Sequence, residues 1–586
     1  MTRKMASRHR STVKRRTVWL LIIFAVLYAA IVGRLVYVQI LESATYVQWA
    51  REIRHREIPV PATRGRILDR AGRVLAVNVE AASIYADKRE IKDQRRIAYQ
   101  VAALLGKEPR AIESKLCGRN CFVYLGRNVD ASVGERIAEL KLPGVGRERS
   151  TRRVYPSGPL AAQVLGFTNI DNVGVEGIEC TMDRILRGRD GLVRAELDNM
   201  RRVIPETRHV VREPANGADV YLTIDTNIQH IAEQALARMA KTYKPESACA
   251  IVLNPTNGEV LAIADYPTYD ANKARQVDPE LWRSRAVADL YEPGSTMKLV
   301  TVAAALEEGI PPHRAVAYCT GRERIKGASV PCVLHKPYLN GHGAVDAYQV
   351  IRHSCNIGAA HLGLWLGSDR LYKYQTAFGL HDRLRAGFWR EARCLRTDPD
   401  AWRPIEIANI SFGQGIAVTP LQMAAVYAAI ANRGIYVTPH VVREARDSQG
   451  ASITLHGAGK SRRAVSRATA EEITRMLVSC VEDGTGKTAS IPGRTVAGKT
   501  GSAQIPNPNG RGYLPGAYVA SFIGFAPAYK PRLVIAVVVK KPQGSHWGAV
   551  VAAPVFKEIG EKALWYLKVA PDAPIKVRPG DRRSTA

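Results

Sequence analysis

Three short motifs in the second half of the chain carry lysine, hydroxyl and amide groups at spacings that could support catalysis. The first is Ser295-Thr296-Met297-Lys298, which precedes an apolar, helix-like segment. Residues three apart on a helix share one face, so we expect Ser295, a candidate nucleophile, to lie beside Lys298, a candidate base. The pattern alone is weak, because Ser295 could simply cap a helix while Lys298 remained solvated. Residues 11–14 repeat the same pattern.

The second motif is Ser354-Cys355-Asn356, which begins 59 residues after Ser295. A hydroxyl and an amide two positions apart can share one hydrogen-bond network with a lysine. The triplet also fits an ordinary turn. We expect Cys355 to be buried and inert, and we assign His353 no catalytic role.

The third motif is Lys499-Thr500-Gly501-Ser502, within a β-like segment. A cation and hydroxyls along a strand edge can bind a carboxylate, and Gly501 would let a substrate backbone approach. Residues 493–500 also match the nucleotide-binding P-loop pattern. A P-loop needs a helix that opens at its Lys-Thr pair, whereas the glycine- and proline-rich residues 501–508 predict none. We therefore reject nucleotide binding.

The elements that would position these motifs are predicted from turn signals and periodicity. Two β-rich runs, 249–253 and 259–264, are joined by an Asn-Gly turn, which indicates a hairpin. Three further β-like runs lie within residues 495–539, and an amphipathic helix is expected at 554–567. Residues 285–480 are mostly helices and loops. This order predicts an α+β fold in which helices cover an antiparallel sheet.

The N-terminal region predicts a membrane anchor. Residues 17–33 carry no charge, and the apolar run continues to residue 41. This length can cross a bilayer if Arg34 extends toward the interface. The first sixteen residues include seven basic ones, which predicts a cytoplasmic N-terminus and an extracytoplasmic remainder. A cleaved signal peptide is the alternative, disfavoured because the apolar run extends past the small residues at 29–30.

The expected domain order follows from these features. We expect a cytoplasmic basic tail (1–16), a transmembrane helix (17–41), a mixed α/β pedestal (42–217), a catalytic domain (218–568) and a C-terminal tail (569–586). The boundary near residue 217 rests on a polar, turn-rich segment, after which Asp225 is placed to cap a helix. No catalytic constellation is apparent in the pedestal.

Charge and cysteine content exclude several classes of function. The net charge of +30 would suit a nucleic acid, an anionic membrane or an acidic polymer. An extracytoplasmic location, with no zinc-finger spacing, RNP-like run or basic heptad, argues against nucleic acid. The cysteine count of nine is odd, so at least one thiol is free or pairs with another chain. We predict no cofactor and no metal ligand.

Taken together, the ordered motifs S-x-x-K, S-x-N and K-T-G resemble those of penicillin-binding proteins and serine β-lactamases, with Cys355 at the variable position. Residues 64–78, 152–179 and 222–229 resemble class B penicillin-binding proteins. Residues 291–298, 412–434 and 552–556 resemble their division-specific, FtsI-type branch. The resemblance covers residues 17–568 and implies an anchor, an elongated pedestal and a β-lactamase-like transpeptidase domain.

This resemblance implies a serine-type D,D-transpeptidase that cross-links stem peptides of the septal cell wall. Ser295 would attack the D-Ala-D-Ala carbonyl, with Lys298 as its base. Ser354 would relay the proton to the leaving amine, and Asn356 would hold Lys298 and the substrate amide. The terminal carboxylate would be received by Lys499, Thr500 and Ser502, in the strand that also contains Gly501. The backbone N–H groups of Ser295 and Ser502 would form the oxyanion hole.

The implied partners are the D-Ala-D-Ala donor, an amine acceptor from a neighbouring stem peptide, β-lactam antibiotics, an FtsW-type glycan polymerase and other divisome proteins at the cell inner (cytoplasmic) membrane. An elongation-specific class B enzyme is the main alternative. A β-lactamase is disfavoured because no Glu-x-x-Leu-Asn element follows Asn356. A bifunctional enzyme would need glycosyltransferase motifs that residues 42–217 lack, and an intact trio of motifs argues against a non-catalytic scaffold.

Overall fold

The computed structural model describes residues 2–198, 203–325, 328–332, 340–381, 383–454, 460–510 and 512–574. The chain divides into two compact units. One comprises Met1–Ala62 and Arg189–Ala215, and the other comprises Thr63–Gly188 and Asn216–Ala586. The expected boundary at residues 217 and 218 stays a prediction.

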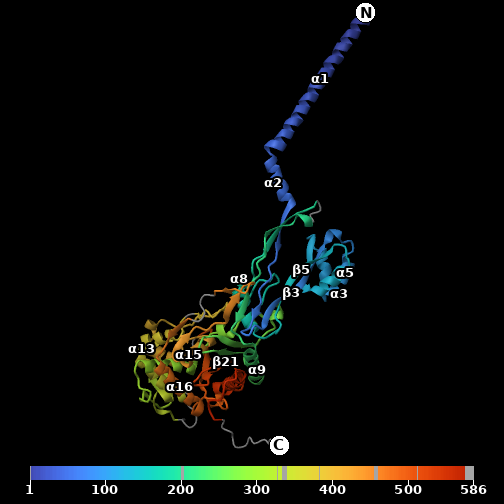
Figure 1. The fold of residues 1–586 in the computed structure, drawn as a ribbon. Helices are drawn as coiled ribbons and strands as arrows, with labels where there is room; N and C mark the ends of the chain where they lie inside the picture. Colours follow the sequence, from blue (N-terminus) through green and yellow to red (C-terminus); the bar gives the residue numbers. More distant parts are fainter. Residues whose placement is uncertain are drawn as a thin grey trace. The chain divides into compact units, whose positions relative to one another are not determined.

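The first unit contains the predicted anchor. Helix α1 (Thr2–Val36) continues through a π-helical turn (Tyr37–Leu41), and α2 (Ser43–Arg54) follows it (Figure 1). Among the described residues, Thr12–Leu41 is the one helical segment long and apolar enough to cross a membrane, and its most apolar part is not buried in the protein. Strands β1 (His55–Val60), β6 (Gly191–Glu196) and β7 (His209–Arg212) form a three-stranded sheet in this unit.

The second unit begins with a mixed α/β subdomain. Strand β3 (Val74–Asp87) pairs antiparallel with β4 (Phe122–Asp130) and β5 (Val145–Val154). Helices α3 (Gln94–Leu105), α4 (Pro109–Cys117) and α5 (Ala131–Glu139) contribute to the core beside these strands. Helix α3 is capped by Asp93 and ends at Gly106, which has a left-handed conformation.

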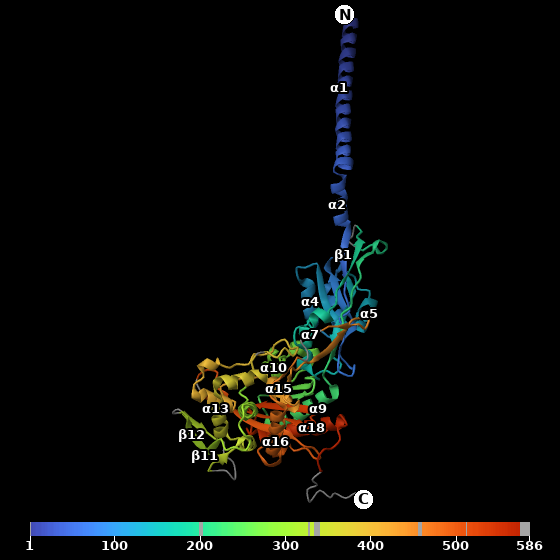
Figure 2. The same cartoon turned by 60° about the vertical axis from the view of Figure 1, so that its left-hand side comes forward.

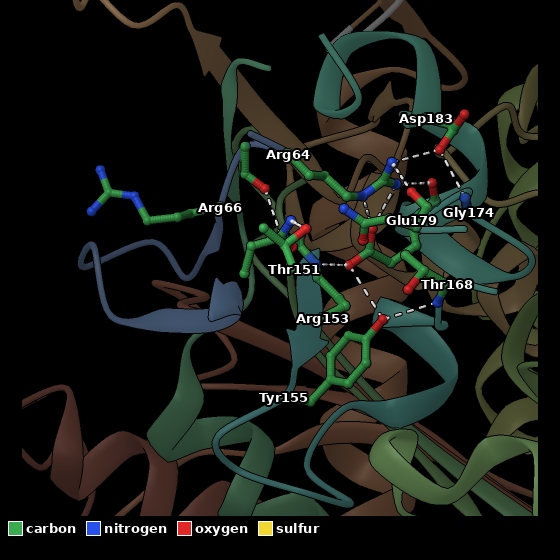
Figure 3. Close-up of polar contacts among 12 residues, drawn as sticks. Arg64, Arg66, Thr151, Arg153, Tyr155, Thr168, Gly174, Glu179 and Asp183 are labelled. Atoms are coloured by element: carbon green, nitrogen blue, oxygen red, sulfur yellow. Dashed lines mark hydrogen bonds and ion pairs between the residues drawn. The ribbon is translucent and has the colours of Figure 1, made fainter. Parts of the chain in front are cut away.

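A buried ion-pair network joins the segments 64–78 and 152–179, which the sequence associates with the pedestal. The side chain of Glu179 accepts hydrogen bonds from Arg64 Nε at 2.8 Å and from Arg153 Nε at 2.6 Å (Figure 3). Arg64 also contacts Asp183 at 2.6 Å, and the Tyr155 hydroxyl lies 3.3 Å from Glu179. Because all but Asp183 are nearly fully buried, each charge depends on its partners for stability.

The part of the second unit that carries the three motifs is built on a five-stranded antiparallel sheet in the order β10-β9-β21-β20-β19. The predicted first hairpin is confirmed as β9 (Ser247–Leu253) and β10 (Val260–Tyr266). The three late runs are confirmed as β19 (Ala497–Pro506), β20 (Tyr513–Ala526) and β21 (Leu533–Lys540). The early and late groups meet where β21 pairs with β9.

Helices cover both faces of this sheet, as the α+β prediction requires (Figure 2). Alternate side chains of β9 point to opposite faces and belong to two separate cores. One core includes α9 (Thr226–Tyr243) and α18 (Ala553–Tyr566). The other includes α11 (Lys298–Glu307), α13 (Asn356–Ala377), α15 (Pro420–Ala431) and α16 (Arg467–Asp483). Asp225 caps α9 as predicted, since its carboxylate accepts from the N–H groups of Asn227 and Ile228.

Candidate active site

Ser295 lies in a 3-10 turn (Gly294–Met297) that leads directly into α11. The α-helix therefore begins at Lys298 rather than at Ser295, one turn later than predicted. Within residues 291–300, Ser295 is the one partly exposed side chain, while its neighbours are buried. The Tyr427 hydroxyl donates to the carbonyl of Thr296 at 3.1 Å, and Gly294 N donates to Gly413 O at 3.0 Å. These contacts hold the turn in which Ser295 stays partly exposed.

The second motif connects α12 (Ala347–Arg352) to α13. Ser354 has a positive φ of 61°, a left-handed conformation that costs a non-glycine residue about 1–2 kcal/mol. Such strain occurs where the surrounding structure enforces it, often at functional sites. Cys355 is fully buried and caps α13, because its sulfur accepts from Gly358 N at 3.4 Å. The expectation that Cys355 is buried is confirmed.

Lys298 brings the first two motifs together. Its Nζ lies 3.1 Å from Ser295 Oγ, 3.2 Å from Ser354 Oγ and 2.6 Å from the Ser354 carbonyl oxygen. A fourth oxygen, Asn356 Oδ1, lies 2.7 Å away. The Ser354 hydroxyl also donates to Ser295 Oγ at 2.8 Å. The Ser295 hydroxyl thus contacts both a lysine and a second hydroxyl, which gives two routes for its proton.

The environment of Lys298 favours its uncharged form. Its side chain is fully buried, and each hydrogen-bond partner of Nζ described above is a neutral oxygen. Burial, assisted by the positive charge of Lys499, lowers the pKa of Lys298 to about 7. Burial also lowers the pKa of Lys499. Lys298 is therefore neutral at a much lower pH than an exposed lysine and is suited to accept a proton near neutral pH.

The third motif lies on β19, which is the edge strand of the five-stranded sheet. Lys499 is fully buried, and its Nζ donates to the Thr500 carbonyl at 3.2 Å. Ser502 is partly exposed and its hydroxyl accepts from Gly548 N at 3.1 Å. An edge strand beside a nucleophile can pair with an extended peptide through backbone hydrogen bonds. Because Lys499 and Thr500 lie inside a strand and open no helix, the rejection of a P-loop is confirmed.

Gly501 has a packing role that the sequence did not reveal. A Cβ at this position would lie 3.1 Å from Thr296 Cγ2 and 3.2 Å from the Pro293 carbonyl, and it would overlap the Ser521 hydroxyl. The absence of a side chain therefore lets β19 lie against the turn that holds Ser295. Close approach of a substrate backbone at Gly501 stays a prediction.

Sequence reasoning missed several residues that hold the site together. Thr485 Oγ1 accepts from Thr500 Oγ1 at 3.1 Å. The Glu292 carboxylate accepts from Gly415 N at 2.8 Å and from the Tyr513 hydroxyl at 3.1 Å, which ties the segment before Ser295 to two distant parts of the chain. Glu292 lies within a segment that carries the family resemblance, but its partners are too far away in sequence for any local pattern to identify them.

Comparisons with known proteins agree with this geometry. Residues 248–561 match the model of the penicillin binding protein transpeptidase domain, and residues 59–222 match that of the penicillin-binding protein dimerisation domain. The chain is 33% identical to stage V sporulation protein D of Bacillus subtilis, over 96% of this chain and 87% of that protein. It is also 33% identical to the peptidoglycan D,D-transpeptidase FtsI of Escherichia coli K12, over 93% of this chain and 90% of that protein.

Solved structures give the same result. A crystal structure of penicillin binding protein 3 from Mycobacterium tuberculosis, complexed with aztreonam, is 28% identical, with a TM-score of 0.69 over 88% of this chain and 99% of that chain. The chain belongs to the penicillin-binding transpeptidase family, as a class B penicillin-binding protein of the FtsI type. It is accordingly a serine-type peptidoglycan D,D-transpeptidase.

Proposed function

We propose that Ser295 is the nucleophile of this transpeptidase and that neutral Lys298 is its base. The contact that carries this proposal is the 3.1 Å separation between Lys298 Nζ and Ser295 Oγ in a buried setting that lowers the pKa of the lysine. The Ser295 proton passes to Lys298 as the oxygen attacks the carbonyl carbon of the D-Ala-D-Ala bond. The carbon–nitrogen bond then breaks, and the terminal D-Ala leaves with a proton relayed through Ser354.

The second half-reaction restores the enzyme. The amine of a neighbouring stem peptide attacks the ester carbonyl of the acyl-enzyme and forms the cross-link, and its proton returns through the same network to Ser295. Asn356 holds Lys298 and the substrate amide. The substrate carboxylate binds Lys499, Thr500 and Ser502, and the N–H groups of Ser295 and Ser502 stabilise the oxyanion. Gly501 leaves room for the donor backbone along the edge of β19.

β-Lactams test these assignments, because the opened ring stays attached to the acyl group and blocks the acceptor amine. The purified full-length chain, treated with penicillin, should carry one long-lived adduct on the peptide that contains Ser295. Peptide mapping by mass spectrometry measures this, and Ser295→Ala should remain unlabelled. Rapid turnover of penicillin, or an adduct on another residue, would contradict the proposal.

We further propose that the protein acts in septal cell-wall synthesis, with the N-terminus in the cytoplasm and residues 42–568 outside the inner membrane. The similarity to FtsI and to a sporulation protein favours this role, and the seven N-terminal basic residues favour this orientation.

We expect a pedestal at 42–217, a transpeptidase domain at 218–568 and a C-terminal tail at 569–586. We also expect contacts with an FtsW-type polymerase and other divisome proteins. Depletion should produce filamentous cells, whereas rounded cells would assign the protein to elongation.

A further inference from the structure

Four side chains of metal-ligating type converge beside the active site without a role in the mechanism above. They are Cys319, Cys332, His342 and Cys355, and all four are buried. Their ligand atoms lie within 4.8 Å of one another. The sequence predicts no metal ligand here, because the four residues follow no familiar zinc-finger spacing.

Local strand pairing explains why these residues meet. Cys319 ends β11 (Ala317–Cys319) and pairs with Gly343 of β14 (Gly343–Val345), so His342 lies next to it. Cys332 follows β13 (Ala328–Pro331), and its N–H donates to the carbonyl of Gly321 at 2.9 Å. These pairings bring three of the ligands to one point, and the cap of α13 supplies Cys355.

Three of the distances within the cluster match those of a tetrahedral metal site. Cys332 Sγ lies 3.8 Å from Cys355 Sγ, and His342 Nδ1 lies 3.5 Å from Cys319 Sγ and 3.6 Å from Cys332 Sγ. A zinc ion with bonds of about 2.3 Å to sulfur and about 2.0–2.1 Å to nitrogen separates two sulfurs by about 3.8 Å and a sulfur from a nitrogen by about 3.6 Å. The four atoms thus surround a space of the size that zinc requires.

The surroundings of the sulfurs also suit thiolate ligands. Backbone N–H groups point at two of them, from Asn356 to Cys332 at 3.3 Å and from Gly358 to Cys355 at 3.4 Å. Donors of this kind orient metal ligands and stabilise the negative charge on sulfur. We propose that Cys319, Cys332, His342 and Cys355 bind one structural Zn²⁺. Three soft thiolates and one imidazole favour zinc over the hard cations, and four protein ligands leave no open position for catalysis.

The site has a consequence for the reaction, which rests on the roles proposed for Ser354 and Asn356. Cys355 lies between these two residues, so a metal bound to its sulfur fixes the loop that contacts Lys298. The same loop is held by Asn356 Nδ2, which donates to the Pro331 carbonyl at 3.0 Å. The metal therefore acts as a positioning device that keeps Ser354 in its strained, left-handed conformation.

Metal content is the direct test. The full-length chain is purified in detergent without a metal-binding tag and dialysed against metal-free buffer. It should then retain about one zinc per chain, measured by inductively coupled plasma mass spectrometry. Cys319→Ser and His342→Ala should lose most of that zinc. Cys394→Ser is the matched control, because Cys394 is also buried but lies outside the cluster, and it should keep the metal. Cobalt in place of zinc should give the visible absorption of a tetrahedral thiolate site.

Two results would overturn the metal site. One is wild-type protein without zinc whose cysteines are all free to alkylation, and the other is wild-type protein with a Cys332–Cys355 disulfide, which an oxidising compartment permits. Neither measurement depends on whether a variant folds.

The positioning role is tested separately. Chelation of the metal should slow acylation of Ser295 by penicillin about ten- to a hundredfold, and added zinc should restore the rate. If the purified protein contains zinc but chelation leaves the rate of acylation unchanged, the metal site stands and the positioning role is refuted. If the protein is acylated neither with zinc nor without it, the proposed function is refuted instead.

Discussion

The rate of acylation by penicillin should rise with pH and level off above an apparent pKa of about 7, because only neutral Lys298 can accept the Ser295 proton. The sign follows from the direction of the shift: burial and the charge of Lys499 lower the lysine pKa from 10.5 to about 7, so deprotonation occurs as the pH rises through neutrality. At pH 7 this raises the neutral fraction from about 3 × 10⁻⁴ to about one half, a gain of about 10³-fold.

The assay measures the second-order rate constant of labelling by a fluorescent penicillin between about pH 5.5 and 9. Between about pH 6 and 8 the constant should rise roughly tenfold, as the neutral fraction rises from about a tenth to about nine tenths. The charged or titratable groups that influence Lys298 are Lys499, Cys319, Cys332 and Cys355. Lys499→Met removes the one cation among them, so the pKa of Lys298 should rise and the midpoint of the profile should move to higher pH. A flat profile, or a midpoint near 10 in the parent protein, would refute the reasoning.

Three other predictions follow from the same structure. Lys298→Ala should slow acylation by about 10²–10⁴-fold while the melting temperature stays close to that of the parent, and labelling at the parental rate would exclude Lys298 as the base. Glu179→Leu leaves Arg64 and Arg153 buried without their shared carboxylate, so it should lower the free energy of unfolding, measured in urea, by about 3–5 kcal/mol. The control Glu57→Gln breaks an exposed ion pair and should lower it by at most about 1 kcal/mol. A reporter fused after Leu41 should be active only outside the cytoplasm, and activity inside would reverse the proposed topology.

Local patterns predicted the elements of this fold well. The Asn-Gly turn between β9 and β10, the three late strands, the cap at Asp225 and the C-terminal helix each depend on residues close together in the chain. The start of α11 was predicted one turn early, because a 3-10 turn and an α-helical turn place a serine and a lysine three residues apart on one face in nearly the same way.

The pairing of β9 with β21 could not be predicted in this way. Residues 247–253 and 534–540 form adjacent strands, although almost the whole catalytic domain lies between them in sequence. Their apolar runs predict that both are buried, but many registers and neighbours would satisfy the same pattern. Only the packing of the two hydrophobic cores against the two faces of the sheet selects one strand order and register.

The sequence by itself determined which groups are available for chemistry: a serine and a lysine one turn apart, a hydroxyl and an amide in S-x-N, and a cation with hydroxyls in K-T-G. It also determined an apolar segment long enough to cross a membrane. The tertiary structure decided what those groups can do. Lys298 is suited to accept a proton because folding buries its side chain and brings it near Lys499, and Cys355 lies beside two other cysteines and a histidine because separate strands bring them there. Residue types and turns are properties of neighbouring residues, whereas desolvation and ligand geometry depend on groups that only folding brings together.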